Sequence, residues 1–206
     1  MKSILISIQP KHVQKICNGN KTIEVRKTRP KIETPFKCYI YCTKGDALAY
    51  PCLNHSKFDI HRANNGTLKG RQMTAKEREQ SDHLYANGKV IGEFTCDKID
   101  EYLCKEYEWE DGDVSLEYHI RSVEGRKTCL EYDEIREYGN EKPLYFWHIS
   151  DLKIYNNPRE LGEFANYNKY QVCKERNCFS DNCWICDNNA LVIRPPQSWQ
   201  FIESLG

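Results

Sequence analysis

The segment Gly19-Asn20-Lys21-Thr22-Ile23-Glu24-Val25-Arg26 is the stretch of this sequence that says most about its fold. Its glycine suits the left-handed backbone that ends many helices. From Thr22 to Arg26 polar and apolar side chains alternate, as they do along a strand. The pattern predicts a helix end, a turn with Lys21 at its rim, and a strand. Glu24 and Arg26 share one face of that strand, so their charges either flank a ligand or form an ordinary surface ion pair.

The segments on either side extend this pattern. Ser3–Ile8 is an apolar run typical of a strand, and Pro10 suits the first position of a short helix. Phe36–Thr43 predicts another strand, and an Asn87-Gly88 turn opens a further one over Lys89–Ile99. The first half of the chain therefore predicts a strand, a helix and several strands in close succession.

The second half predicts a helix over Leu130–Tyr138 and then an aromatic strand over Pro143–Ile149, which Leu152–Tyr155 continues. A short helical turn at 158–164 and a strand-like segment at 190–194 follow. Many short strands with few helices predict an α+β fold built on a small mixed β-barrel with flanking short helices.

Residues 46–88 interrupt the strand pattern with a polar stretch that holds several Asn and Gly residues. We interpret this stretch as an insertion between strands, with one helical candidate at Thr74–Leu84. The predicted organisation is a barrel over residues 1–160, including the insertion, and a C-terminal extension over residues 161–206.

Composition and charge narrow the class of protein. The chain has 206 residues, of which 39% are hydrophobic, so it can form a core and is not disordered as a whole. It contains no apolar run of about 18 residues, so a transmembrane helix is not expected. The net charge is zero, but residues 11–37 carry eight Lys or Arg against two Glu, and residues 93–137 carry fifteen Asp or Glu against six Lys or Arg. The basic end suits a phosphate backbone, and two solvated faces are the alternative.

The eleven cysteines include a cluster in the extension. Four thiols within one short segment match the tetrahedral ligand set of a structural Zn²⁺ ion, and disulfides, free thiols or an iron–sulfur cluster are the alternatives. The predicted metal ligands are Cys173, Cys178, Cys183 and Cys186. Scattered single cysteines without a secretory signal indicate a reducing compartment, so we expect a cytoplasmic protein.

Three segments together resemble the ASCH family of the PUA-like superfamily. They are Ser3–Pro10, the Gly-x-Lys-Thr-x-Glu-x-Arg stretch that starts at Gly19, and the strand Gly88–Phe94. The resemblance covers roughly residues 3 to 155. It implies a small β-barrel with a cleft, between barrel and helices, that holds RNA or a nucleobase.

The resemblance also implies site residues. Some small ASCH proteins are amidohydrolases of N4-acetylcytidine with a Lys, a Thr and a Glu at their centre. The Lys matches Lys21 and the Glu matches Glu93, whereas the Thr position holds Glu24, which departs from the family pattern. Lys21, Glu24 and Glu93 are therefore the candidate catalytic residues, for either amide hydrolysis or RNA cleavage.

The predicted nucleic-acid contacts are Lys21, Arg26, Lys27, Arg29 and Trp147. The cations would contact phosphate, and Trp147 either stacks on a base or belongs to the core. Binding of RNA or of a modified nucleoside is the leading hypothesis. A hydrolase acting on nucleosides or RNA is the second, and a zinc-stabilised protein-interaction module is the third.

Overall fold

The computed structural model describes residues 2–44, 49–52, 57–60, 87–102, 123–140, 142–175 and 190–205. Its strands are β1 (Ser3–Ile8), β2 (Ile23–Arg26), β3 (Phe36–Cys42), β4 (Ala49–Cys52), β5 (Lys57–Ile60), β6 (Val90–Tyr102), β7 (Leu144–Arg159), β8 (Phe164–Asn166) and β9 (Trp199–Ser204). Its helices are α1 (Pro10–Cys17), α4 (Val123–Arg126), α5 (Tyr132–Gly139), the 3₁₀ turn η2 (Leu161–Glu163) and α6 (Tyr167–Glu175).

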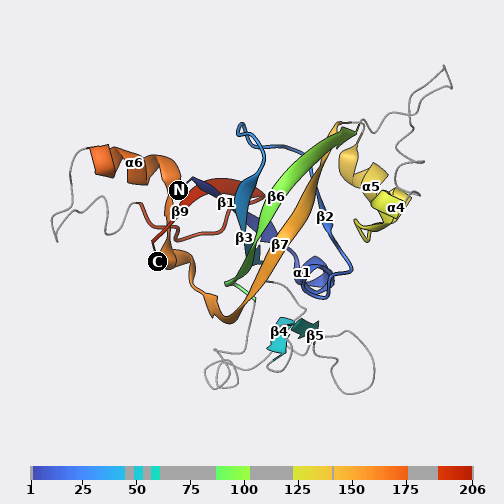
Figure 1. Cartoon of the computed structure of the whole chain (residues 1–206), viewed down its shortest axis with the longest axis horizontal. Helices are drawn as coiled ribbons and strands as arrows, with labels where there is room; N and C mark the ends of the chain where they lie inside the picture. The colour runs from blue at the N-terminus through green and yellow to red at the C-terminus, as the bar shows by residue number, and fades with distance from the viewer. Residues whose placement is uncertain are drawn as a thin grey trace.

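Seven strands form one mixed sheet in the order β2-β7-β6-β3-β1-β9-β8. Strands β1 and β3 are parallel, and every other pair is antiparallel. Figure 1 shows α4 and α5 at one end of this sheet and α6 with both chain termini at the other. The α+β class is as predicted from the sequence.

The predicted small mixed β-barrel is observed as an open mixed sheet, whose edge strands β2 and β8 do not pair with each other. Closure would require β2 to pair with the far end of the sheet, but β9 pairs with β1 and β8 pairs with β9, so the C-terminal segment occupies that edge. Strand β2 is joined to β1 by a side chain instead, because Arg26 Nη2 donates a hydrogen bond to Ser7 O at 2.6 Å. A seam between β1 and β2 is the result.

Both faces of the sheet are covered by apolar side chains. Strands β1, β3 and β6 pack one set of side chains, including Ile6 and Cys38, against Val13 and Ile16 of α1. They pack the alternate set, including Tyr39, on the opposite face. Each strand therefore has buried residues at consecutive positions, as the all-buried pattern of β1 illustrates.

Local predictions hold where the apolar pattern is strong. The strand at Ser3–Ile8 and the helix from Pro10 are confirmed. The two segments expected at 143–155 form one long strand, β7, and the turn expected at 158–164 is the short η2. The aromatic segment near the C-terminal end of the sequence forms the strand β9.

The predicted insertion contributes the hairpin β4–β5, which lies beside α1 (Figure 1). The helical candidate at Thr74–Leu84 lies outside the described residues. Within the described ranges, no helix has the length and apolar character needed to cross a membrane.

Candidate functional site

The turn after α1 positions the first residue of the site. The helix stops at Asn18, and Gly19 adopts a positive φ of 75°, the left-handed conformation that the sequence predicted for it. The backbone N–H groups of Asn20 and Lys21 both donate to Lys15 O, at 2.9 and 3.0 Å. This turn directs Lys21 inward, so the residue is not at an exposed rim.

Lys21, Glu24 and Arg26 form a buried ionic triad. Lys21 Nζ lies 3.3 Å from Glu24 Oε2, and Arg26 Nη2 lies 3.1 Å from Glu24 Oε1. The three residues are only 1%, 6% and 7% exposed. Lys21 Nζ also donates to Thr128 O at 2.7 Å, which ties β2 to the turn between α4 and α5. These charges are therefore not the ordinary surface ion pair that the sequence left open.

The triad keeps Glu24 ionised. Burial by itself would raise the pKa of this carboxyl group, but the neighbouring charges of Lys21 and Arg26 outweigh burial and hold the pKa below its usual range. A negative charge with two buried cations leaves the triad with a net positive charge. Such a group favours an anionic or electron-rich ligand beside it.

A cavity of about 470 Å³ opens beside the triad, at the seam between β1 and β2. Helix α1 contributes His12 and α5 contributes Glu134 and Tyr138, so chain segments far apart in the sequence meet here. The cationic side chains of its lining outnumber the carboxylates by three to two. They are Lys11, Lys21 and Arg26 against Glu24 and Glu134.

Two buried polar atoms at this cavity are unsatisfied. Among the described residues, neither His12 Nδ1 nor Arg26 Nε has a hydrogen-bond partner. Burial, opposed by the nearby charge of Glu24, lowers the pKa of His12 to about 4, so the imidazole is neutral near pH 7. Buried polar groups normally have a hydrogen-bond partner in the protein or in ordered water. The lining of the cavity therefore combines a neutral His12 with the buried triad.

Part of the predicted basic end, Lys27, Arg29 and Lys31, forms a basic strip next to this cavity. Lys27 Nζ lies 4.6 Å from the ring centroid of Tyr138, a residue of the cavity lining. Lys27, Arg29 and Lys31 line a neighbouring hollow of about 590 Å³. Tyr138, which is 38% exposed, thus joins the cavity to the strip.

Glu93 is not part of this cavity, although the sequence hypothesis brought it together with Lys21. Its carboxylate accepts hydrogen bonds from Lys37 Nζ at 3.0 Å and from Tyr155 Oη at 2.6 Å. Glu93 is paired with Tyr39 across β3 and β6, and Tyr39 faces away from the α1 side of the sheet. Alternation along β6 therefore places Glu93 on the opposite face from the triad.

Trp147 belongs to the core. It is fully buried, and its ring packs edge-on against Phe36 at 5.7 Å and lies 6.1 Å from the ring of Trp199. The aromatic strand is real, but this ring has no face open to a base. Tyr138, which the sequence did not single out, is an aromatic residue that lines the cavity.

The predicted metal ligands are largely outside the described residues. Cys173 is buried in α6 and takes part in a disulfide bond, whereas Cys178, Cys183 and Cys186 lie in the part that the structure does not describe. In the described ranges, no group of three or more His, Cys, Asp or Glu residues is arranged to hold a metal ion. The zinc prediction therefore stays a prediction.

Comparison with known proteins bears on the fold. No protein family matches the sequence, and no curated protein matches it either. Among solved structures, an ASCH protein from Zymomonas mobilis and two mutants of it are similar, each with 16% identity over 98% of this chain and a TM-score of 0.50. The matches cover 87% of the ASCH protein and 91% and 88% of the mutants.

This likeness defines the fold of the chain as that of an ASCH domain. The resemblance predicted from the segment at Gly19–Arg26 is thus confirmed at the level of structure. The match extends through β8, α6 and β9, beyond the stretch of residues 3–155 on which the sequence resemblance rested.

Proposed function

We propose that this protein binds RNA or a modified nucleoside, with the base held in the cavity between α1, β1 and β2. The observation that carries the proposal is one cavity that is lined by a buried triad of net positive charge and by the side chains of His12 and Tyr138.

The chemistry of the lining suits a nucleotide. The Glu24 carboxylate, kept ionised by its neighbours, can accept a hydrogen bond from an exocyclic amine of a base. Lys11 at the cavity edge and the Arg26 guanidinium can contact a phosphate. Tyr138 offers an aromatic ring to a base, and such stacking contributes about 1–3 kcal/mol.

The basic strip favours RNA over a lone nucleoside. Lys27 contacts the Tyr138 ring and also lines the neighbouring hollow with Arg29 and Lys31. Cations therefore continue from the cavity along the surface, as a phosphate backbone requires.

The hydrolase hypothesis stays a prediction. Lys21 Nζ, the group that would activate a nucleophile, is held by Thr128 O and by Glu24. The pKa of His12, near 4, makes that imidazole a weak base. No contact among the described residues favours catalysis over binding.

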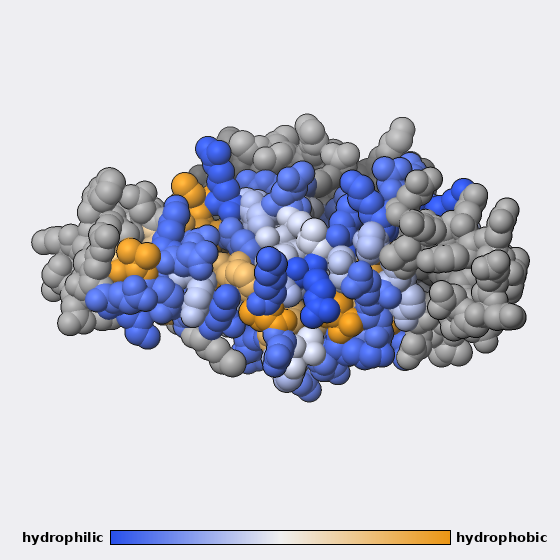
Figure 2. Space-filling model, turned by 90° about the horizontal axis from the view of Figure 1, so that it is seen from above, coloured by the Kyte–Doolittle hydropathy of each residue, from blue (hydrophilic) through white to orange (hydrophobic). Residues whose placement is uncertain are grey.

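The interaction-module hypothesis also lacks a specific observation in its favour. Seen from above the view of Figure 1, the described surface is mainly hydrophilic, and its hydrophobic residues form small separate patches (Figure 2). A protein-docking surface would show a larger continuous apolar patch.

Binding can be tested with a fluorescently labelled, mixed-sequence RNA hexamer. We expect anisotropy to report saturable binding whose affinity falls as salt rises, with a slope of about −0.7 in log–log form for each phosphate contacted. A folded protein that binds neither the hexamer nor any of a panel of modified nucleosides would refute the proposal.

We further propose a structural zinc ion in the C-terminal extension, held by Cys173, Cys178, Cys183 and Cys186. The support is the spacing of four soft ligands, and the disulfide at Cys173 is the competing state of that thiol. Protein purified under reducing conditions should contain about one zinc per chain by elemental analysis, because one tetrahedral site uses all four thiolates. A chain that is metal-free and stable under those conditions would contradict this assignment.

A further inference from the structure

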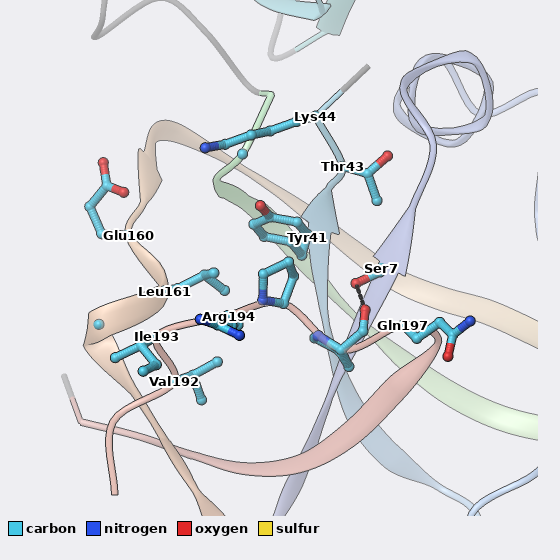
Figure 3. Close-up of a pocket in the computed structure, with 14 residues that line it drawn as sticks. Ser7, Tyr41, Thr43, Lys44, Glu160, Leu161, Val192, Ile193, Arg194 and Gln197 are labelled. Atoms are coloured by element: carbon cyan, nitrogen blue, oxygen red, sulfur yellow. Dashed lines mark hydrogen bonds between the residues drawn. The ribbon is translucent and has the colours of Figure 1, made fainter. Parts of the chain in front are cut away.

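A second, larger cavity adjoins the first. It measures about 850 Å³ and lies between the end of β3, the turn η2 and the C-terminal segment before β9 (Figure 3). Three residues line both cavities: Ser7, Thr43 and Gln197. The two hollows are therefore neighbours across a shared wall, and both lie in the size range of ligand sites.

The second cavity is cationic. Lys44 and Arg194 line it, and Figure 3 shows them on either side of Tyr41. Among the described residues that line it, Glu160 is the one with a carboxylate, and that group pairs with Lys89 Nζ at 3.0 Å. Within this part of the chain no ion pair is found for Lys44 or Arg194, so their charges can attract an anion.

One wall of this cavity is rigid and apolar. Ser7 Oγ donates to Pro196 O at 2.6 Å, and Val192 N donates to Phe164 O at 2.8 Å, so the backbone is fixed on both sides of the exposed part. Between these anchors Ile193 is 76% exposed, so its aliphatic side chain faces outward from a fixed segment. Next to the proline rings it offers a preformed surface to a sugar or a base.

We propose that the two cavities are successive subsites for single-stranded RNA, so that the ligand is a strand and not a free nucleoside. This inference rests on the proposed function. The first cavity holds one base, and Lys44 and Arg194 hold the next phosphate, with its nucleotide against Ile193. Thr43 and Gln197 stand at the boundary between the cavities, where their polar side chains can pair with a ribose 2′-hydroxyl.

The test compares a labelled RNA hexamer with a mixture of nucleoside 5′-monophosphates that competes for the same protein. The double variant Lys44→Ala/Arg194→Ala should bind the hexamer at least tenfold more weakly. Its salt slope should fall by about 0.7, because the contact with one phosphate is lost. Competition by the monophosphates should stay unchanged. Lys153→Ala, an exposed cation that pairs across the sheet with Glu93, is the matched control and should bind like the wild type.

The outcomes separate the two claims. Wild-type protein that binds neither probe and none of the modified nucleosides overturns the proposed function and this inference with it. Binding of a modified nucleoside alone overturns this inference and leaves the proposed function standing. Equal affinity for hexamer and monophosphates, with no effect of the double variant, overturns this inference alone. A DNA hexamer that binds as tightly as the RNA hexamer overturns the proposed contact with the ribose 2′-hydroxyl. A polyglutamate peptide that displaces the RNA at equal charge concentration overturns the RNA assignment of the second cavity in favour of an acidic protein partner.

Discussion

At the scale of single residues, the triad is the feature on which the site depends. Glu24 contacts a cation with each of its oxygens, and both cations are nearly as buried as the carboxylate itself. Removing one partner of a buried ion pair leaves an uncompensated charge away from water, which is strongly destabilising. Lys21 and Glu24 therefore stabilise the folded site, and both also line its cavity.

We predict that Glu24→Gln, which keeps the side chain's shape, lowers the free energy of unfolding by about 3 kcal/mol, because Lys21 and Arg26 are then buried without their counter-ion. Glu93→Gln is the matched control. Its partner Lys37 has a side chain that is 41% exposed, so this ion pair should contribute below about 1 kcal/mol. Urea denaturation at neutral pH measures both, and equal losses would contradict the account.

The same residues predict how stability depends on pH. The folded chain keeps His12 neutral until its lowered pKa of about 4, whereas the unfolded chain protonates it near the ordinary histidine pKa of 6.5. Between these values the unfolded state binds more protons, so stability falls as pH falls. The lowered pKa of Glu24 also makes stability fall with pH, below the ordinary glutamate pKa of 4.5. The positive charges of Lys11, Lys15 and Lys21 disfavour a protonated His12 in the folded chain.

The measurement is the melting temperature between pH 7 and pH 5 for the wild type and for His12→Gln. The wild type should lose more stability over this range than the variant, which has no imidazole to protonate. Parallel curves would show that His12 is not held neutral in the fold.

At the scale of helices and strands, the sequence pattern predicted well where several elements lie along the chain. It predicted poorly which face of a strand or helix a polar residue occupies. Strand β1 and the start of helix α1 were predicted to the residue because apolar spacing is unambiguous there. Glu93 was placed on the wrong face because β6 is covered on both sides, and alternation does not say which side faces the site. His12 was missed since a polar residue on an amphipathic helix has the same pattern whether it faces solvent or a cavity.

The turn at Gly19 gives a prediction at this scale. Its positive φ of 75° strains any residue with a Cβ, although no atom lies within 4 Å of where that Cβ would be. Gly19→Ala should therefore lower the free energy of unfolding by about 1–2 kcal/mol through backbone strain alone, a drop of roughly 2–8 °C in melting temperature.

Gly162→Ala is the control for Gly19→Ala. Gly162 also has open space around its Cβ position, but no positive φ is recorded for it, so this variant should melt like the wild type. A loss at Gly162 as large as that at Gly19 would show that the turn is not the cause.

At the scale of the whole molecule, the site exists because the sheet does not close. Strand β9 pairs with β1, and these two segments come from opposite ends of the chain. A pairing of such distant segments has no local sequence signature, so the number of short strands predicted a barrel without showing that the sheet stays open. The seam that results is spanned by Arg26, and it brings β1, β2, α1 and α5 to one cavity.

The central claim is that this cavity binds a base. Tyr138 tests it most directly, because the residue lines the cavity yet is 38% exposed, so substituting it should leave the fold intact. In anisotropy titrations with the RNA hexamer, Tyr138→Phe should bind within about twofold of the wild type. Tyr138→Ala should bind about 5- to 150-fold more weakly, the loss of a stacking contact of about 1–3 kcal/mol. Wild-type affinity in a folded Tyr138→Ala protein would contradict the claim.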